Sequence, residues 1–379
     1  MSDTARKDAI SAAIQARIPS LIWGPPGTGK TSFVEQLAEE LGIPVETIIA
    51  SIREPSDFSG LPVITPSGVK MEAPMWAKNL ANAELDNGNI SGVLFIDEIT
   101  TCAPATQAAL LRVINDGWVG ELKLPSTVAR VAAANPPEQA AGGWNLAAPL
   151  ANRFLHIDWP SNAEAWCDAA MQGWKNSTSS VRVPHDWYKY EDAKLSLVSA
   201  YIRTRNEKLL VLPKEEAKRG KAWASPRTWH MLSKTLAVVE ATGGQLDDDA
   251  QIYLIGGAIG VENAREFLTW MRELDLPEPE ELLKDPKKFK LPKSRPDKTY
   301  AILSSVATAV LSNLTQARWE AGWKVLAEAA SQGNADIAAF AARAFIKAGT
   351  ENQMNFDKIL KVLAPFTEIM RGAGLMLDN

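Results

Sequence analysis

A glycine-rich stretch near the N-terminus constrains this chain more than any other feature. It fits the pattern G-x-x-x-x-G-K-[ST], follows an apolar run at residues 21–23 and precedes a helical pattern at residues 32–41. Glycines let backbone N–H groups curl round a phosphate, and the N-terminus of the following helix favours the same anion. The pattern predicts a phosphate-binding loop (P-loop) for a nucleoside triphosphate. Its residues are Gly24, Pro25, Pro26, Gly27, Thr28, Gly29, Lys30, Thr31 and Ser32.

Within this loop, two side chains have separate expected roles. Lys30 is expected to reach the β- and γ-phosphates, and the Thr31 hydroxyl is expected to hold a Mg²⁺ ion. The alternative is a glycine turn beside a surface lysine. That alternative does not account for a strand, a loop and a helix that occur in register.

Two adjacent carboxylates, Asp97 and Glu98, follow a second apolar run at residues 93–96. Open α/β sheets bind ligands at the carboxyl ends of their strands, so we expect both acids beside the P-loop. Asp97 is suited to the Mg²⁺ shell, and Glu98 is suited to deprotonating a water that attacks the γ-phosphate. The alternative is a pair of acids that cap the next helix.

A polar amide follows a third apolar run. Asn135 comes directly after residues 132–134, where it could hydrogen-bond the γ-phosphate or the attacking water. Asn-Pro is also a plain turn signal. Because the run follows the one that ends at Asp97, we favour the functional interpretation.

Apolar runs alternate with helical patterns through the first part of the chain. Residues 45–50, 92–96, 128–134 and 154–157 read as buried strands, and residues 104–115 read as a helix that Gly117 caps. This alternation predicts an α/β nucleotide-binding domain with a parallel sheet flanked by helices over residues 1–160. Further domains are expected as an all-α lid at residues 161–275, a Pro/Lys-rich linker at 276–298 and a C-terminal helical extension at 299–379.

Composition excludes several classes of protein. The net charge of −5 argues against nucleic acid as the main partner, and the basic run within residues 284–298 is more typical of a solvated face. Two cysteines and three histidines predict neither a disulfide framework nor a His-based metal site. No signal-peptide core and no membrane-spanning run is evident, so we expect a cytoplasmic location. The thirteen tryptophans are expected mainly in cores or interfaces.

Taken together, the motifs resemble the AAA+ ATPases, and more narrowly the MoxR-like branch of the helix-2-insert clade. In this resemblance Asn135 corresponds to sensor 1, Arg153 within residues 150–154 to the arginine finger, and Arg227 within residues 224–227 to sensor 2 at the start of a lid helix. The resemblance covers about residues 1–275. It implies that ATP and Mg²⁺ bind, that copies assemble into a ring, most often a hexamer, and that Arg153 acts on the neighbouring subunit's γ-phosphate while Arg227 acts on its own subunit's.

Two predicted hairpins agree with that branch. Residues 61–72 fall where the clade inserts a hairpin into helix 2, and residues 118–124 precede the sensor-1 strand. In such proteins both loops face the ring's pore or a client, although ordinary surface hairpins would give the same pattern. The resemblance further implies a chaperone that remodels, assembles or activates a protein client, with a von Willebrand factor A domain protein as partner.

Two rival functions remain open from the sequence. One is a nucleic-acid motor of the restriction or replication type, whose hydrolysis would be stimulated by DNA in a salt-sensitive way. The other is a nucleotide-switched binding module, in which ATP sets partner affinity and turnover is incidental.

Overall fold

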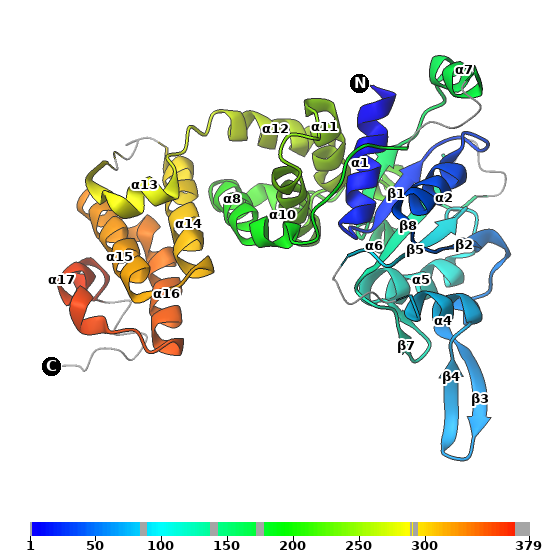
Figure 1. Cartoon of the computed structure of the whole chain (residues 1–379), viewed down its shortest axis with the longest axis horizontal. Helices are drawn as coiled ribbons and strands as arrows, with labels where there is room; N and C mark the ends of the chain where they lie inside the picture. The colour runs from blue at the N-terminus through cyan, green and yellow to red at the C-terminus, as the bar shows by residue number, and fades with distance from the viewer. Residues whose placement is uncertain are drawn as a thin grey trace. The chain divides into compact units, whose positions relative to one another are not determined.

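The computed structural model describes residues 2–83, 89–136, 143–171, 178–288, 290 and 295–367. Contacts divide the chain into two compact units (Figure 1). The first unit comprises Met1–Glu191 and Lys208–Glu266, and the second comprises Asp192–Glu207 and Phe267–Asn379. Parts of the region predicted as a lid thus belong to each unit, and the domain boundaries proposed above stay a prediction.

A five-stranded parallel sheet forms the centre of the first unit. Its strand order is β2-β5-β8-β1-β9, and every neighbouring pair is parallel. The strands are β1 (Ser20–Trp23), β2 (Val45–Ile49), β5 (Gly92–Asp97), β8 (Val128–Ala134) and β9 (Leu155–Asp158). This arrangement confirms the predicted α/β class.

Burial explains why these runs form strands. Residues such as Leu21, Leu94, Phe95 and Ala132 are fully buried, as expected for a parallel sheet that helices cover. The helix α5 (Pro104–Asp116) begins with Pro104 in its first turn and ends at Gly117 in the left-handed conformation, so the predicted cap is confirmed. The unit's other helices are α1 (Asp3–Gln15), α2 (Lys30–Leu41), α3 (Ser56–Ser59), α4 (Met75–Ala81), α6 (Ala148–Ala151), α7 (Ala163–Met171), α9 (Glu216–Arg219), α10 (Pro226–Ala241) and α11 (Asp248–Ile259).

Both predicted hairpins form, and they contact each other. The first pairs β3 (Leu61–Thr65) with β4 (Gly68–Glu72), and the second pairs β6 (Trp118–Val119) with β7 (Leu122–Lys123). The Glu121 N–H donates to the Met71 carbonyl at 3.2 Å, and the Met71 N–H donates to the Glu121 carboxylate at 3.2 Å. A Cβ at Gly120 would lie 2.6 Å from the Met71 carbonyl oxygen, so only glycine allows this approach.

The second unit is helical. It contains all but the first residue of α8 (Glu191–Thr204) and the second half of α12 (Val261–Arg272). Its other helices are α13 (Pro279–Lys284), α14 (Pro296–Ser312), α15 (Gln316–Ser331), α16 (Ala335–Glu351) and α17 (Leu360–Leu363). Trp319 and Trp323 are fully buried in its core, as expected for most tryptophans, whereas Trp166 of the first unit is exposed. Residues 289 and 291–294 of the basic run, and residues 368–379 of the expected extension, lie outside the described residues.

No helix in the described ranges combines the length and apolarity that a membrane crossing requires.

Asp297 joins α12 to the start of α14 within the second unit. Its carboxylate, 6% exposed, accepts hydrogen bonds from the Trp270 indole at 2.7 Å and from two Arg295 nitrogens at 3.0 Å. Burial alone would raise the pKa of Asp297, but these hydrogen bonds outweigh it and lower the pKa to about 2.

Replacing Asp297 with alanine should therefore destabilise the second unit. We expect Asp297→Ala to lower the free energy of unfolding at pH 7 by about 2–3 kcal/mol, because it leaves the Trp270 N–H buried without an acceptor. The carboxylate's contribution is fully present above pH ~4, and in the unmodified chain it should be lost as the pH falls toward 2. Urea unfolding measures both effects. Asp336→Ala, which removes an exposed acid of α16, is the control, and equal stabilities of the two variants would contradict the assignment.

Candidate active site

The P-loop connects β1 to α2 in the predicted manner. Gly27 and Gly29 have positive φ angles of 75° and 84°, which glycine adopts without strain. Gly24 has no space for a side chain, because a Cβ there would lie 2.2 Å from the Trp159 carbonyl oxygen. The Thr28 hydroxyl donates to the Pro25 carbonyl at 2.8 Å and closes the loop.

Trp159 holds this loop at its start and near its middle. Its backbone N–H donates to the Trp23 carbonyl at 2.5 Å, and its indole N–H donates to the Thr28 carbonyl at 2.9 Å. The ring packs on Phe33 of α2, with 5.0 Å between ring centroids. Sequence reasoning did not identify this residue, since its only signal was the abundance of tryptophan.

The Lys30 ammonium lies over the loop and is only 6% exposed as a residue. It donates to the Gly24 and Pro25 carbonyls at 2.8 Å each and to the Asn135 side-chain oxygen at 3.1 Å. Burial lowers the pKa of Lys30, while the charges of Asp97 and Glu98 oppose that shift. The lysine therefore links the P-loop to the end of β8.

Asp97, the last residue of β5, lies beside the start of α2. The Thr31 hydroxyl donates to one Asp97 carboxylate oxygen at 2.7 Å, and the Glu98 N–H donates to the other at 2.8 Å. A hydroxyl and a carboxylate oxygen side by side fit Mg²⁺, which uses one or two protein ligands together with substrate phosphates. Across the described residues, no group of three or more His, Cys, Asp or Glu side chains could hold a metal ion.

Glu98 occupies an unusual backbone conformation. Its φ of 56° lies in the left-handed region that non-glycine residues seldom adopt, and such strain concentrates at functional sites. The Ser51 hydroxyl donates to the Glu98 carboxylate at 2.5 Å, and the Thr101 hydroxyl donates to the Glu98 carbonyl at 2.8 Å. Sequence reasoning missed Ser51, although it follows a predicted strand at the edge of the sheet where ligands bind.

Asn135 extends from the end of β8 between these groups. Its side-chain oxygen accepts from Lys30, and its carbonyl accepts from the buried Thr100 hydroxyl at 3.3 Å. Lys30, Thr31, Asp97, Glu98 and Asn135 thus lie on three segments, which are at the carboxyl ends of β1, β5 and β8 and leave the sheet at one edge. The structure brings these predicted residues together.

Arg153 lies toward the amino ends of the strands, opposite to the P-loop. In the parallel register, Ser20 pairs with Leu155 and Trp23 pairs with Asp158, so Arg153 precedes the strand end that is remote from the P-loop. Four strand residues span about 13 Å. The Arg153 guanidinium donates to the Pro149 carbonyl, while its Nε is buried and has no hydrogen-bond partner.

Arg227 lies near Arg153. Burial lowers the pKa of Arg153, and the positive charge of Arg227 lowers it further, against the opposing effect of Asp116. Arg227 is exposed in the first turn of α10. The structure therefore places the two predicted arginines close to each other.

Asn152 joins the segments that carry these arginines. Its side-chain oxygen accepts from the Ser225 hydroxyl at 2.7 Å, and its side-chain nitrogen donates to the Trp223 carbonyl at 3.3 Å. Ser225 is also the N-cap of α10 and forms a reciprocal capping box with Thr228. The start of α10 is therefore fixed to the residue preceding Arg153.

His156 of β9 connects α6 to the strand that leads into the P-loop. Its Nδ1 accepts from the Trp23 indole N–H at 2.9 Å, so its Nε2 carries the proton and donates to the Ala151 carbonyl at 2.9 Å. Burial lowers the pKa of His156 to about 4, and Lys221 contributes to the shift. The imidazole is therefore neutral near pH 7.

Because Gly24 has no space for a Cβ, Gly24→Ala should displace the loop from Trp159. We expect at least a tenfold loss in affinity for a fluorescent ATP analogue, measured by equilibrium titration. Gly256→Ala is the matched control, since a Cβ there would make only ordinary contacts of 3.8 Å or more. Unchanged affinity of Gly24→Ala would refute this account of the loop.

The neutral His156 should make the fold sensitive to acid. A lowered pKa means that stability is full above the unfolded value of about 6.5 and falls as the pH drops toward 4, by about 3 kcal/mol in total. His156→Gln can retain an acceptor for Trp23 and a donor for Ala151 but cannot titrate. Urea unfolding between pH 7 and 4.5 should show less loss of stability in this variant. Parallel pH profiles for both proteins would contradict the prediction.

A comparison with protein families matches the part of the chain that carries this site. The family model described as "ATPase family associated with various cellular activities (AAA)" matches residues 20–153, which include the P-loop, Asp97, Glu98 and Asn135. A sequence comparison with curated proteins finds no match. Among solved structures, the chain is similar to a "putative ATPase" from Cytophaga hutchinsonii, with 14% identity, a TM-score of 0.40, and coverage of 70% of this chain and 88% of that one. Residues 20–153 thus match the AAA ATPase family, and this match identifies an ATP hydrolase.

Proposed function

We propose that this chain hydrolyses ATP at the contact between adjacent copies in a ring and uses the hydrolysis to remodel, assemble or activate a protein client. The observation that carries the proposal is the separation of Arg153 from the P-loop. A strand of about 13 Å lies between the two ends of the sheet, so Arg153 is poorly placed to reach its own subunit's γ-phosphate. A neighbouring copy can present Arg153 there. A ring of six, as in MoxR-like proteins, follows from the resemblance.

Most of the chemistry would come from one subunit. Lys30 would bind the β- and γ-phosphates, Thr31 and Asp97 would hold Mg²⁺, and Glu98 would orient a water and accept its proton. When bound, the metal ion neutralises charge on the β- and γ-phosphate oxygens. Asn135 would polarise the water or the γ-phosphate. All these contributions are positioning and charge stabilisation.

The hydrogen bond from Ser51 holds Glu98 in an arrangement that differs from the catalytic one proposed above. While Ser51 donates to Glu98, one carboxylate oxygen is occupied and is a weaker proton acceptor. Productive hydrolysis would require Glu98 to exchange this partner for the attacking water. A charge-assisted hydrogen bond contributes about 1.5–3 kcal/mol. The need to break the bond from Ser51 would therefore slow hydrolysis by about tenfold or more.

Arg153 and Arg227 are better understood as a pair. Two nearby guanidinium groups repel each other, and a phosphate oxygen between them would remove that cost. The resemblance assigns Arg227 to its own subunit's nucleotide, but the proximity of the two arginines favours a shared role on the neighbour's nucleotide. Asn152 and Ser225 would keep both at a fixed spacing.

The hairpin of β3 and β4 supports a protein client. Several of its apolar side chains are exposed, with Ile64 at 89% and Val69 at 66%. Exposed apolar groups gathered on one element mark protein-binding surfaces. A partner with a von Willebrand factor A domain is suggested by the MoxR-like resemblance alone.

Mixed-subunit hydrolysis tests the ring directly. Arg153→Ala should bind ATP normally but hydrolyse it at least 100-fold more slowly, because the transition state loses a guanidinium. Lys30→Ala should fail to bind ATP. Mixing the two inactive variants should restore part of the turnover, since some interfaces then combine an intact P-loop with an intact Arg153. Arg343→Ala, at an exposed arginine of α16, is the control and should hydrolyse at the normal rate.

Normal turnover by Arg153→Ala, or no recovery on mixing, would exclude catalysis between subunits. Hydrolysis that DNA stimulates strongly at low salt but not at high salt would instead support the nucleic-acid motor. Partner binding that follows nucleotide state without any effect of the partner on turnover would support the switched module.

A further inference from the structure

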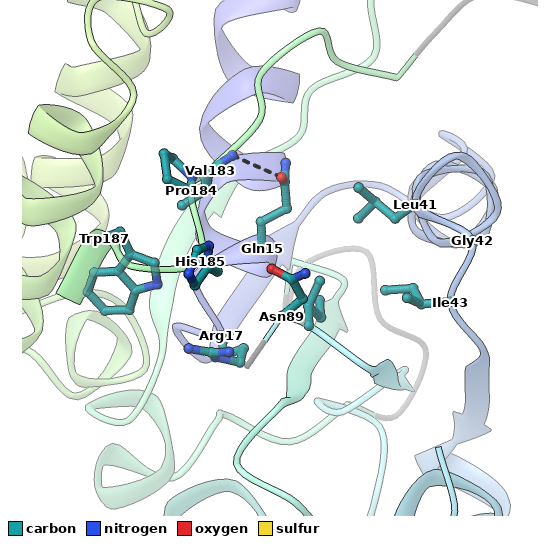
Figure 2. Close-up of a pocket in the computed structure, with 11 residues that line it drawn as sticks. Gln15, Arg17, Leu41, Gly42, Ile43, Asn89, Val183, Pro184, His185 and Trp187 are labelled. Carbon is teal, nitrogen blue, oxygen red and sulfur yellow. Dashed lines mark hydrogen bonds between the residues drawn. The ribbon is translucent and has the colours of Figure 1, made fainter. Parts of the chain in front are cut away.

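A pocket of ≈ 360 Å³ lies in the first unit, at the end of α2 remote from the P-loop (Figure 2). Its walls come from the C-terminal ends of α1 and α2, from the residues that precede β1 and β5, and from the segment around η3 (Trp187–Tyr190). Helix α2 has twelve residues, so Lys30 and the pocket are separated by about 18 Å along its axis. The pocket is therefore a site separate from the nucleotide.

The lining combines an apolar surface with hydrogen-bond donors. Leu41, Ile43, Ile90, Val183 and Pro184 provide the apolar part. Among the described residues that line the pocket, none is acidic. Small-molecule sites usually occupy about 300–1,000 Å³ and place a few polar groups on mostly apolar walls, as here.

The Trp187 indole N–H is a hydrogen-bond donor without an acceptor. The residue is only 5% exposed, and its indole nitrogen is buried without a hydrogen-bond partner. In Figure 2 the nitrogen edge of the ring is turned toward the other lining side chains. Leaving a buried N–H unsatisfied costs about 1–3 kcal/mol, and an acceptor on a ligand would recover that cost.

Arg17 supplies a positive charge. Its backbone has a φ of 60°, an uncommon conformation for a residue other than glycine, and the Arg17 N–H donates to the Ile14 carbonyl at 2.9 Å. Burial lowers the pKa of Arg17, against the opposing effect of Tyr188, but an arginine stays charged at neutral pH. The half-buried guanidinium lines the same pocket as the Trp187 indole.

Two described acids that lie next to lining residues in sequence, Glu40 and Asp186, form hydrogen bonds with other groups. The Glu40 carboxylate accepts from the Thr178 hydroxyl at 2.7 Å, and the Asp186 carboxylate accepts from the Lys189 ammonium at 2.7 Å.

The Gln15 amide holds one wall of the pocket in place through hydrogen bonds within the protein. Its amide nitrogen donates to the Ser11 hydroxyl and to the Val181 carbonyl at 2.9 Å each, and its oxygen accepts from the Val183 N–H at 3.1 Å. These bonds attach the segment before η3 to α1, so the pocket is preformed on this side (Figure 2).

We propose that this pocket binds a small organic anion. Its acidic group would lie between the Arg17 guanidinium and the Trp187 indole N–H, and its apolar body would lie on Leu41, Ile43 and Ile90. A carboxylate and a phosphate monoester share this chemistry, since both accept paired hydrogen bonds from arginine. The inference is independent of the ring and of the client proposed above.

Three probes with the same ring separate the possibilities: phenylacetate, phenyl phosphate and phenethylamine. The full chain, labelled with ¹⁵N at its tryptophan indoles, is titrated with each, and Trp187→Phe identifies the Trp187 resonance. We expect at least one of the two anions to move this resonance downfield in a saturable way, and the amine to leave it unmoved. Whichever anion binds more tightly identifies the acidic group.

Variants then test the contacts. Trp187→Phe, which keeps an aromatic ring, and Arg17→Gln should each weaken binding of the anion at least tenfold by ligand-observed NMR. Trp166→Phe, the same change at an exposed tryptophan, should leave it unchanged. ATP hydrolysis at the wild-type rate shows that each variant is folded. The proposal fails if neither anion shifts the resonance up to about 10 mM, if the amine binds as well, or if a folded Trp187→Phe binds the anion normally.

Discussion

The parallel register of the five-stranded sheet is the constraint on which the site depends. Because β1, β5 and β8 all run in the same direction, the P-loop, Asp97 and Asn135 leave the sheet at the same edge. The same register sends the start of β9, and with it Arg153, to the other edge. This topology brings together the groups proposed to bind the phosphates, and it places Arg153, the arginine proposed to act on a neighbouring copy, away from them. The proposed catalysis between neighbouring copies would therefore follow from the topology of the sheet and not from any single residue.

Buried polar contacts then fix this arrangement. Lys30 connects the P-loop to Asn135, and Thr31 connects it to Asp97, so the loop cannot move without disturbing two strands. Trp159 holds the loop from β9. On the remote side, Trp23, His156 and Ala151 form a hydrogen-bonded series that ends next to Asn152, which binds the N-cap of α10. The contacts of His156 and Asn152 are buried and the others are partly buried. An unpaired partner in a buried setting costs about 1–3 kcal/mol, so the network favours one geometry.

Much of this could be predicted from the sequence, because local patterns carry it. Apolar runs identified the strands, and the P-loop pattern identified Lys30 and Thr31 by residue type and spacing. Ser51, Trp159 and His156 could not be found in this way, since their roles come from contacts across the sheet that no local spacing encodes. The proximity of Arg227 to Arg153 was likewise hidden, because it depends on how Asn152 fixes the start of α10. Residues 279–284, expected within a linker, form α13, whose Leu282 is buried in the core of the second unit, and prolines in the sequence concealed that packing.

In the proposed ring, one copy alone carries a reaction centre that lacks the arginine of its neighbour. The most direct measurement is turnover per chain as the protein is diluted, with the association state followed in parallel by mass photometry. We expect turnover per chain to fall steeply as assemblies dissociate and to approach zero for the separated copies. A strictly monomeric population that hydrolyses ATP at the undiluted rate would contradict it.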